Sequence, residues 1–419
     1  MQAIENEEKS FDAVREDPGR LDASVATVGP AVSLFTGGID RPYAFGLTRA
    51  LGSAGVRIEV LGSPELADVT TADLPSVEFL NLYGDLRERQ SRIKRVLRHL
   101  ACYGRIMVHA LRTRSKIFHI LWNYKFEVFD RTVLMAFFKL LGKKVVLTAH
   151  NVNAATRDGN ESSINRLSLK SQYRLSDHIF VHTEAMKSEL QHQFGIEGSS
   201  VTVIPFGINN AVPNTPLTPM EAKQKIGMGP AEKVILFYGR IRHYKGLHLL
   251  VEAFKQLVPT HDDYRLVIAG EPKKDTIEYW REICGETEEL TRRGIVIREG
   301  RFIFDEETEV YFKAADVIVM PYTSIFQSGV IFLAYSFGLP VIAADVGSLR
   351  SDIEEGKTGY LCRPNDPGSL AEMIERYFSS DLYGCLNERR PEIKEFASER
   401  NSWSEVRDMT VKVYRELLN

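Results

Sequence analysis

Short apolar runs alternate with helical segments along nearly the whole chain, and this alternation constrains the fold most. Apolar runs at 31–36 and 56–61 flank a helical segment at 44–51, and the pattern restarts at 234. Strands that alternate with helices form parallel sheets with right-handed crossovers. A chain of 419 residues is longer than a domain that folds around a single hydrophobic core usually is. We therefore predict an α/β protein with two Rossmann-like domains that face a cleft. The other predicted strands are 144–149, 178–183, 201–204, 234–238, 265–269, 295–298, 317–320 and 341–344.

Changes in composition suggest where the chain divides. A Pro-, Asn- and Thr-rich stretch at 210–218 is typical of a linker. The final segment contains an amphipathic helix, but its pattern does not identify the surface against which it docks. The predicted divisions are a polar lead at 1–29, a first domain at 30–212, a second domain at 213–395 and a C-terminal helix at 396–419.

The composition excludes several classes of protein. A net charge of −3 argues against a dedicated nucleic-acid binder. Four scattered cysteines indicate a reducing compartment and no zinc site. The first residues are polar and acidic, unlike a signal peptide, and charged residues interrupt every apolar run before it reaches membrane-spanning length. We expect a cytoplasmic protein without a metal site.

A loop at 237–246 follows an apolar strand and leads into a helical segment. It contains glycines and two fixed cations, Arg240 and Lys245. Arginine and lysine bind phosphate groups through charged hydrogen bonds. The alternatives are that Arg240 forms a surface ion pair and that Lys245 only begins a helix.

A second loop, at 321–330, has the same strand–turn–helix pattern. Its small residues Ser328, Gly329 and Val330 stand where the helix begins. The free amides at a helix N-terminus bind phosphate. We predict that the two loops together hold the diphosphate of a nucleotide-activated substrate.

Two features of the first half lie at the carboxyl ends of predicted strands, where α/β sheets bind ligands. Gly37-Gly38 follows the first strand, although such a pair is also an ordinary way to make a tight turn. His150 follows the strand at 144–149. It could donate a hydrogen bond to a sugar hydroxyl or a developing charge, or it could be a structural histidine.

Residues 86–120 carry many basic side chains, which only Glu88 opposes. A basic amphipathic helix is typical of a protein that lies on an anionic membrane surface. The alternative is a solvated helix that packs on its own domain. The basic residues are Arg87, Arg89, Arg92, Lys94, Arg95, Arg98, Arg105, Arg112, Arg114 and Lys116. Between them, at helical spacing, lie Ile93, Val96, Leu97, Leu100, Ile106, Met107, Val108 and Leu111.

Taken together, several short motifs resemble those of the family 4 glycosyltransferases, which have the GT-B fold. The resemblance covers nearly the whole chain from about Ala31. The motifs are Gly37-Gly38, 148–151, 203–209, 238–240 with 244–246, 268–270, 315–317, 338–343, Gly347 and 358–361. The resemblance implies a hexosyltransferase-like enzyme that uses a nucleotide-diphosphate sugar, retains the anomeric configuration and needs no metal or other cofactor. It also implies polysaccharide or glycoconjugate synthesis, with a saccharide or polyprenyl-linked acceptor.

The resemblance also implies roles for individual residues. The Gly37-Gly38 loop would close over the phosphate side of the donor, and His150 would meet its sugar. Arg240 and Lys245 match the family's basic pair on the diphosphate, where cations replace a metal. We therefore expect catalytic roles for His150, Arg240 and Lys245. The other expected donor contacts are Gly239, Glu271, Gln327, Ser328, Gly329, Val330 and Phe302, the last beside the base unless it is a core phenylalanine.

The chain departs from the family at two positions. The family has two glutamates eight positions apart, and these positions are Ile325 and Leu333 here. Gln327 could replace one carboxylate as a neutral partner, whereas recognition of the ribose by a side chain at Leu333 is lost. In a front-face mechanism the leaving phosphate takes the acceptor proton, so neither glutamate need be the base. We expect an active enzyme with altered donor contacts.

Two alternatives remain open from the sequence. The missing glutamates also fit a catalytically silent GT-B protein that serves as a binding or scaffold subunit. A nucleotide-sugar epimerase of the same fold fits less well, because the motifs follow the transferase spacing.

Overall fold

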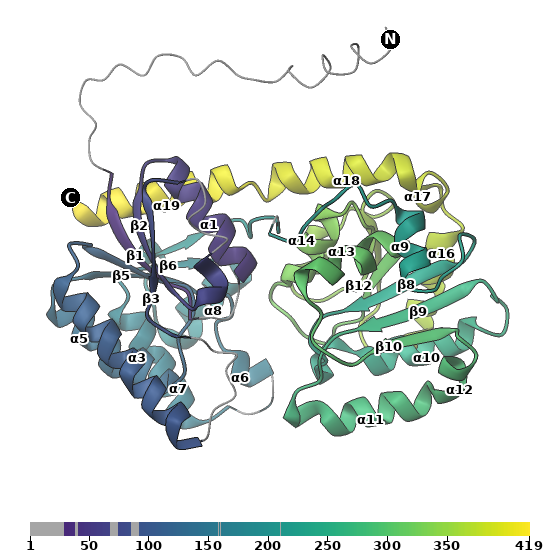
Figure 1. Ribbon diagram of the computed structural model, residues 1–419, viewed down its shortest axis with the longest axis horizontal. Coiled ribbons are helices and arrows are strands. Elements are labelled where there is room, and N and C mark those ends of the chain that lie inside the picture. The colour runs from purple at the N-terminus through teal and green to yellow at the C-terminus, as the bar shows by residue number, and fades with distance from the viewer. Residues whose placement is uncertain are drawn as a thin grey trace, which may run out of the picture.

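A computed structural model describes residues 29–37, 41–67, 74–84, 92–157, 159, 161–209 and 211–419. In this part of the chain, two α/β domains lie next to each other, each built on a parallel sheet (Figure 1). The predicted α/β class with two Rossmann-like domains is confirmed.

The first sheet has seven parallel strands in the order β3-β2-β1-β4-β5-β6-β7. Successive side chains of its strands enter opposite cores: Phe35 and Val145 pack on one face, Leu34 and Val146 on the other. Burial on both faces explains why these strands are continuous apolar runs. The strands are β1 (Ala31–Phe35), β2 (Arg57–Gly62), β3 (Val77–Asn81), β4 (Ile117–Ile120), β5 (Lys144–Thr148), β6 (His178–Val181) and β7 (Val201–Val203).

The helices of this domain begin and end where local chemistry permits. Thr183 caps α8 by accepting a hydrogen bond from the Met186 amide, and Gly195 ends α8 in a left-handed conformation, with φ of 68°. The helices are α1 (Arg41–Ser53), α3 (Arg92–Arg112), α4 (Glu127–Phe129), a π-helical turn (Asp130–Leu134), α5 (Met135–Leu140), α6 (Ala154–Arg157), α7 (Ser163–Leu175) and α8 (Glu184–Phe194). Short 3-10 turns occupy Pro64–Leu66 and Gly198–Ser200.

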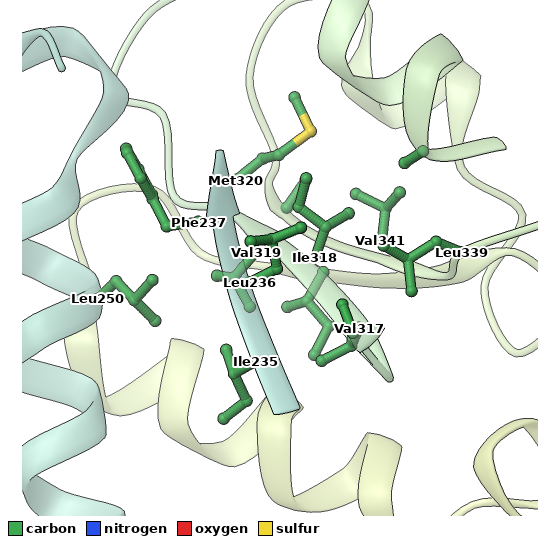
Figure 2. Close-up of a cluster of buried hydrophobic side chains, with 14 of the residues drawn as sticks. Ile235, Leu236, Phe237, Leu250, Val317, Ile318, Val319, Met320, Leu339 and Val341 are labelled. Carbon is green, nitrogen blue, oxygen red and sulfur yellow. The ribbon is translucent and has the colours of Figure 1, made fainter. Parts of the chain in front are cut away.

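The second sheet has six parallel strands in the order β10-β9-β8-β11-β12-β13, which repeats the pattern of the first. Figure 2 shows its centre, where side chains of β8 and β11 pack with Leu250, Leu339 and Val341. The strands are β8 (Lys233–Tyr238), β9 (Tyr264–Ala269), β10 (Val296–Glu299), β11 (Val317–Met320), β12 (Val341–Ala344) and β13 (Gly359–Cys362).

The helices of the second half cover this sheet and continue beyond it. They are α9 (Pro219–Lys225), α10 (Leu247–Leu257), α11 (Ile277–Glu286), α12 (Glu288–Arg292), α13 (Asp305–Ala314), α14 (Gly329–Ser336), α15 (Leu349–Asp352), α16 (Pro367–Phe378), α17 (Asp381–Gly384), α18 (Leu386–Arg400) and α19 (Trp403–Leu418). Short 3-10 turns occupy His243–Lys245 and Lys274–Thr276.

The C-terminal helix returns to the first domain, as the yellow ribbon in Figure 1 shows. Helix α19 packs on α1. The indole of Trp403 lies so close to Gly46 and Gly207 that a Cβ on either would be 2.1–2.3 Å from the ring, and its Nε1 donates to the Ile208 carbonyl at 2.9 Å. Tyr414 reaches His119 at 2.6 Å. The docking site that the sequence left open is therefore the first domain.

Three strands are absent from the sequence prediction: β3, β4 and β13. Strand β4 lies within the basic segment 86–120, where we expected a helix; the helix α3 ends at Arg112 and the chain then enters the centre of the sheet. None of the described helices is both long and apolar enough to span a bilayer.

Candidate active site

In each sheet the chain reverses its direction of travel between the two central strands, and α/β proteins bind ligands at such switch points. In the second sheet these strands are β8 and β11, whose register pairs Ile235 with Val317. The loops predicted to hold a diphosphate, 237–246 and 321–330, leave the carboxyl ends of these two strands. The topology therefore places the two predicted diphosphate loops side by side at one edge of the second sheet.

Lys245 is the buried cation of the first loop. Its side chain is only 6% exposed, its Nζ lies 3.3 Å from the Tyr238 carbonyl, and no described carboxylate pairs with it. Burial, with the charges of Arg240, Arg157 and Arg242, lowers the pKa of this lysine to about 7. An anion placed here would relieve the repulsion and restore the charge.

Glycines make room for this lysine. Gly239 has a φ of 98°, and a Cβ there would lie 2.7 Å from the Lys245 Nζ. Gly246 ends the turn in a left-handed conformation, with φ of 65°, and a Cβ there would lie 2.0 Å from the Pro321 carbonyl oxygen. The close approach of Gly246 to Pro321 places the two loops in direct contact.

Two arginines, Arg240 and Arg157, add positive charge near Lys245. Arg240 is exposed and forms no ion pair with another described residue. Arg157, from α6 of the first domain, lies 4.1 Å from the Tyr244 ring centroid in the first loop. The site therefore collects cations from both domains. The sequence analysis missed Arg157, because a lone arginine on a short helix carries no motif.

The second loop ends at the start of α14. Ser328 is buried and caps this helix, its Oγ accepting from the Val330 amide at 3.3 Å. The first amides of an α-helix have no partner within the helix, so Ser328, Gly329 and Val330 present donors beside Lys245.

A cleft of about 340 Å³ joins these elements. Among the described residues, no group of histidine, cysteine, aspartate or glutamate side chains is arranged to hold a metal ion. The lining residues are Pro42, Tyr43, Asn151, Arg157, Phe206, Gly207, Asn209, Tyr244, Lys245, Ile325, Gln327, Ser328, Gly329, Val330 and Leu333.

Ile325 and Leu333, the positions that we matched to the family glutamates, both line this cleft and give its wall two apolar side chains. Gln327 lies between them along the chain; its Nε2 donates to the Asp352 carboxylate at 3.4 Å, and its buried Oε1 has no partner among the described residues.

On the first-domain side, Gly37 follows β1 with a φ of 61°. A Cβ there would lie 2.6 Å from the Trp122 Cβ and 2.8 Å from two carbonyl oxygens of the loop after β4. Glycine is needed here because the loops of the two central strands touch. Gly38 lies outside the described residues.

His150 stacks on Trp122 with ring centroids 4.1 Å apart and meets the edge of Tyr43. Cleft residues Tyr43 and Asn151 adjoin it, but His150 does not itself line the cleft. Its Nδ1 lies 3.1 Å from His182 Nε2, and His182 Nδ1 lies 3.3 Å from the Ile204 carbonyl. Burial holds the pKa of His150 well below its ordinary value, so the ring is neutral.

This histidine pair fixes the tautomer. A carbonyl only accepts, so His182 Nδ1 donates to Ile204, and His182 Nε2 then accepts from His150 Nδ1. The remaining His150 Nε2 is a buried lone pair without a partner among the described residues. His150 is therefore arranged to accept a hydrogen bond from a hydroxyl, whereas the sequence led us to expect a donor.

Five predicted donor contacts among the described residues are not part of the cleft lining: Gly37, Gly239, Arg240, Glu271 and Phe302. Glu271 pairs with Lys273 at 2.5 Å, next to the first loop, where its carbonyl accepts from the Ile241 amide. Phe302 is 55% exposed and its ring meets Phe304 edge-on at 5.2 Å. The interpretation of Phe302 as a core residue is wrong, because a core side chain would be buried.

Two family models match consecutive parts of the chain. "Glycosyltransferase Family 4" matches residues 37–212, and "Glycosyl transferases group 1" matches residues 232–380. Among curated proteins, D-inositol 3-phosphate glycosyltransferase of Corynebacterium urealyticum is 29% identical over 252 residues, covering 58% of this chain and 57% of the relative. The chain thus spans less than two thirds of the length of such relatives.

Solved structures share the fold across almost the whole chain. Sucrose-phosphate synthase from Thermosynechococcus elongatus matches with a TM-score of 0.72 at 19% identity, covering 93% of this chain and 99% of its own. Anabaena HepE, solved in complex with UDP and glucose, matches with a TM-score of 0.71 at 17% identity, covering 93% and 100%. From the two family models and this shared fold, the chain belongs to the group 1, family 4 glycosyltransferases with the GT-B fold.

Proposed function

We propose that this chain transfers a sugar from a nucleotide-diphosphate sugar to a hydroxyl of a saccharide or lipid-linked acceptor, with retention of configuration and without a metal. The observation that carries the proposal is Lys245, a buried lysine with a lowered pKa and no carboxylate partner among the described residues. Arg240 adds a second cation near Lys245, and the start of α14 lines the same cleft as Lys245. A diphosphate supplies the negative charge that this arrangement lacks.

In the proposed reaction, the bond between the anomeric carbon and the diphosphate oxygen breaks, and the acceptor oxygen bonds to that carbon from the same face. The acceptor proton passes to the leaving diphosphate. Lys245 and Arg240 stabilise the charge that develops on that group. His150 Nε2, a buried acceptor beside the cleft residues Tyr43 and Asn151, is assigned to a sugar hydroxyl, and Gly37-Gly38 is assigned to the phosphates. Glu271, next to the first loop, and Phe302 are assigned to the nucleoside end.

UDP-glucose is the first donor to test, since Anabaena HepE has been solved with UDP-glucose at 17% identity. Purified protein is incubated with UDP-glucose and a saccharide acceptor; released UDP and the anomeric proton of the product are measured. We expect acceptor-dependent release and a retained anomer. Arg240→Ala should weaken donor binding; unchanged binding would count against the site. Epimerised nucleotide sugar formed without acceptor would instead indicate an epimerase.

One observation favours a second candidate, a catalytically silent binding subunit: Ile325 and Leu333 line the cleft where the family has glutamates. A silent subunit would bind the nucleotide without turnover. Ordinary turnover by the purified single chain excludes this candidate.

We further propose that helix α3 attaches the protein to the cytoplasmic face of an anionic membrane. The inner face of α3, which packs on its own domain, is formed by His99, Tyr103, Ile106 and other buried residues. A separate apolar stripe faces outward. Its exposed fractions are Ile93 75%, Val96 50%, Leu97 59%, Leu100 56%, Val108 44% and Leu111 63%.

The charge of α3 suits anionic lipid. The helix contains six arginines or lysines and no acid across Arg92–Arg112. Exposed apolar residues and basic residues on one helix bind at the lipid headgroup boundary. A lipid-linked acceptor would be found at this surface.

Flotation with anionic liposomes tests the attachment. We expect the wild type to float, and the variants Leu97→Ser with Leu100→Ser, or Lys94→Gln with Arg95→Gln and Arg98→Gln, to remain below. Met220→Ser, which changes an exposed apolar residue of the second domain, is the control. Equal flotation of all variants would mean that α3 is only solvated.

A further inference from the structure

The loop that carries Gln327 is fixed against the segment after β12. Gly347 has a φ of 57°, and a Cβ there would lie 1.8 Å from the Ile325 carbonyl oxygen. The Ser348 amide donates to the Phe326 carbonyl at 2.9 Å. The backbone that leads into Gln327 is therefore held at a close approach that only glycine permits.

The side chain of Gln327 is oriented by Asp352, at the end of α15. The carboxylate oxygen Oδ2 of Asp352 accepts from the Ser348 hydroxyl at 2.8 Å and from Gln327 Nε2 at 3.4 Å. An ionised carboxylate can only accept, so the amide must turn its N–H toward Asp352. The amide oxygen, Oε1, then points away from Asp352.

That oxygen is the unusual atom. Gln327 lines the cleft, yet Oε1 is buried and has no hydrogen-bond partner among the described residues. A buried carbonyl without a partner costs stability, and few persist in native proteins without a reason. The missing partner must be a donor, which a sugar hydroxyl is.

We propose that Gln327 accepts a hydrogen bond from a hydroxyl of the donor sugar, and that Asp352 is the positioning residue that keeps the amide oxygen turned toward it. This inference rests on the proposed nucleotide-sugar function. It assigns to a neutral acceptor, held from a different segment, the sugar recognition that a glutamate provides elsewhere in the family. The donor must therefore carry a hydroxyl at this position, and a fluorine in its place would not serve.

Protonation of Asp352 would reverse the orientation of the Gln327 side-chain amide. Around this carboxyl lie Ser348 on its own segment, Tyr335 of α14 and Arg400 of α18. Burial, outweighing the Ser348 hydrogen bond and the Arg400 charge, raises the pKa of Asp352 to about 6. A protonated Asp352 can donate to Gln327 Oε1, which would turn N–H toward the cleft. Sugar recognition should then weaken below about pH 6.

The experiment compares the dissociation constants of a nucleoside diphosphate and its sugar donor, using UDP with UDP-glucose and GDP with GDP-mannose. The ratio is the dissociation constant of the nucleoside diphosphate divided by that of the sugar donor. It measures how much the sugar adds to binding, because effects on the diphosphate cancel. We expect Gln327→Met to reduce this ratio about five- to tenfold, the worth of one hydrogen bond, while nucleoside diphosphate affinity is kept. Asp352→Asn should reduce it less, because its side chain can also donate and so permits both amide orientations.

The controls separate positioning from a structural role. Asp345→Asn alters a carboxylate of the same segment that pairs with Arg350 and not with Gln327, and should leave the ratio unchanged. In the wild type the ratio should fall as pH drops through 6, and in Asp352→Asn it should be flat. A ratio unchanged in Gln327→Met overturns the inference, and so does a flat wild-type profile. If neither nucleoside diphosphate binds the wild type, the proposed function itself fails.

Discussion

At the scale of single residues, Lys245 links the stability of the protein to its proposed activity. Its pKa falls from 10.5 to about 7 in the folded state, chiefly through burial. Between these values the unfolded chain binds the proton more tightly, so wild-type stability should rise as pH increases from about 7 to about 10. The contribution is at most about 1.4 kcal/mol per pH unit.

Lys245→Met keeps the volume and removes the charge. We expect the variant to be more stable than the wild type at pH 7 and to lose this part of the pH dependence, in thermal denaturation series across the range. Equal stability at pH 7 would mean that the ammonium is already solvated or paired.

Gly239 provides a second test at this scale. A Cβ there would lie 2.7 Å from the Lys245 Nζ, and a φ of 98° strains any larger residue. Gly239→Ala should weaken nucleotide binding and destabilise the fold by about 1 kcal/mol or more. The control is Gly285→Ala in α11, where a Cβ would meet no atom within 4 Å and helix propensity predicts a gain of about 0.5–1 kcal/mol. Titration of a nucleoside diphosphate and chemical denaturation measure both.

At the scale of elements, α19 is the helix whose role the sequence could not give. Its amphipathic pattern predicts a buried face but does not identify the surface that covers it. The contact of Trp403 with two glycine positions on the first domain answers that question. Trp403→Ala should cost about 3 kcal/mol in chemical denaturation, since a large ring is lost from a closely packed contact. Leu418→Ala, at the exposed end of the same helix, should change stability little.

The elements also show how far the sequence reaches. The alternation of apolar runs and helical segments predicted β1, β2, β5, β6, β7 and the strands β8 to β12. Strand β4 was missed because a run of four residues, Ile117–Ile120, cannot be distinguished from the end of a helix by periodicity alone.

The candidate site was predictable where motifs carry it. Lys245 and Ser328 follow from loop chemistry and from the family resemblance, and the structure places both at the cleft. Arg157 and Asp352 were missed because each acts through a tertiary contact, with Tyr244 and Gln327 respectively. No local pattern encodes such a pairing.

At the scale of the whole molecule, the two domains touch across the cleft. Arg41 of α1 pairs with Asp305 of α13 at 3.0 Å, and Phe206 stacks on Phe332 at 5.2 Å. We expect these contacts to favour the closed form that surrounds the donor. The ion pair is partly exposed, so its contribution is below about 1 kcal/mol.

Arg41→Ala should therefore raise the KM for the donor by no more than about fivefold, with kcat changed less, in a steady-state assay. Lys255→Ala breaks the exposed pair with Glu286 within one domain and should have no effect. An equal effect of both variants would indicate that the interdomain pair has no special role.

The most direct test of the diphosphate site is calorimetric titration of nucleoside diphosphates at pH 7 in two buffers of different ionisation enthalpy. Lys245 is about half protonated at that pH, so diphosphate binding should take up about half a proton in the wild type. Lys245→Arg, which is always charged, should bind without this uptake, and Lys245→Met should bind much more weakly. Unchanged affinity in Lys245→Met, or binding by the wild type without proton uptake, would contradict the assignment of the diphosphate to Lys245.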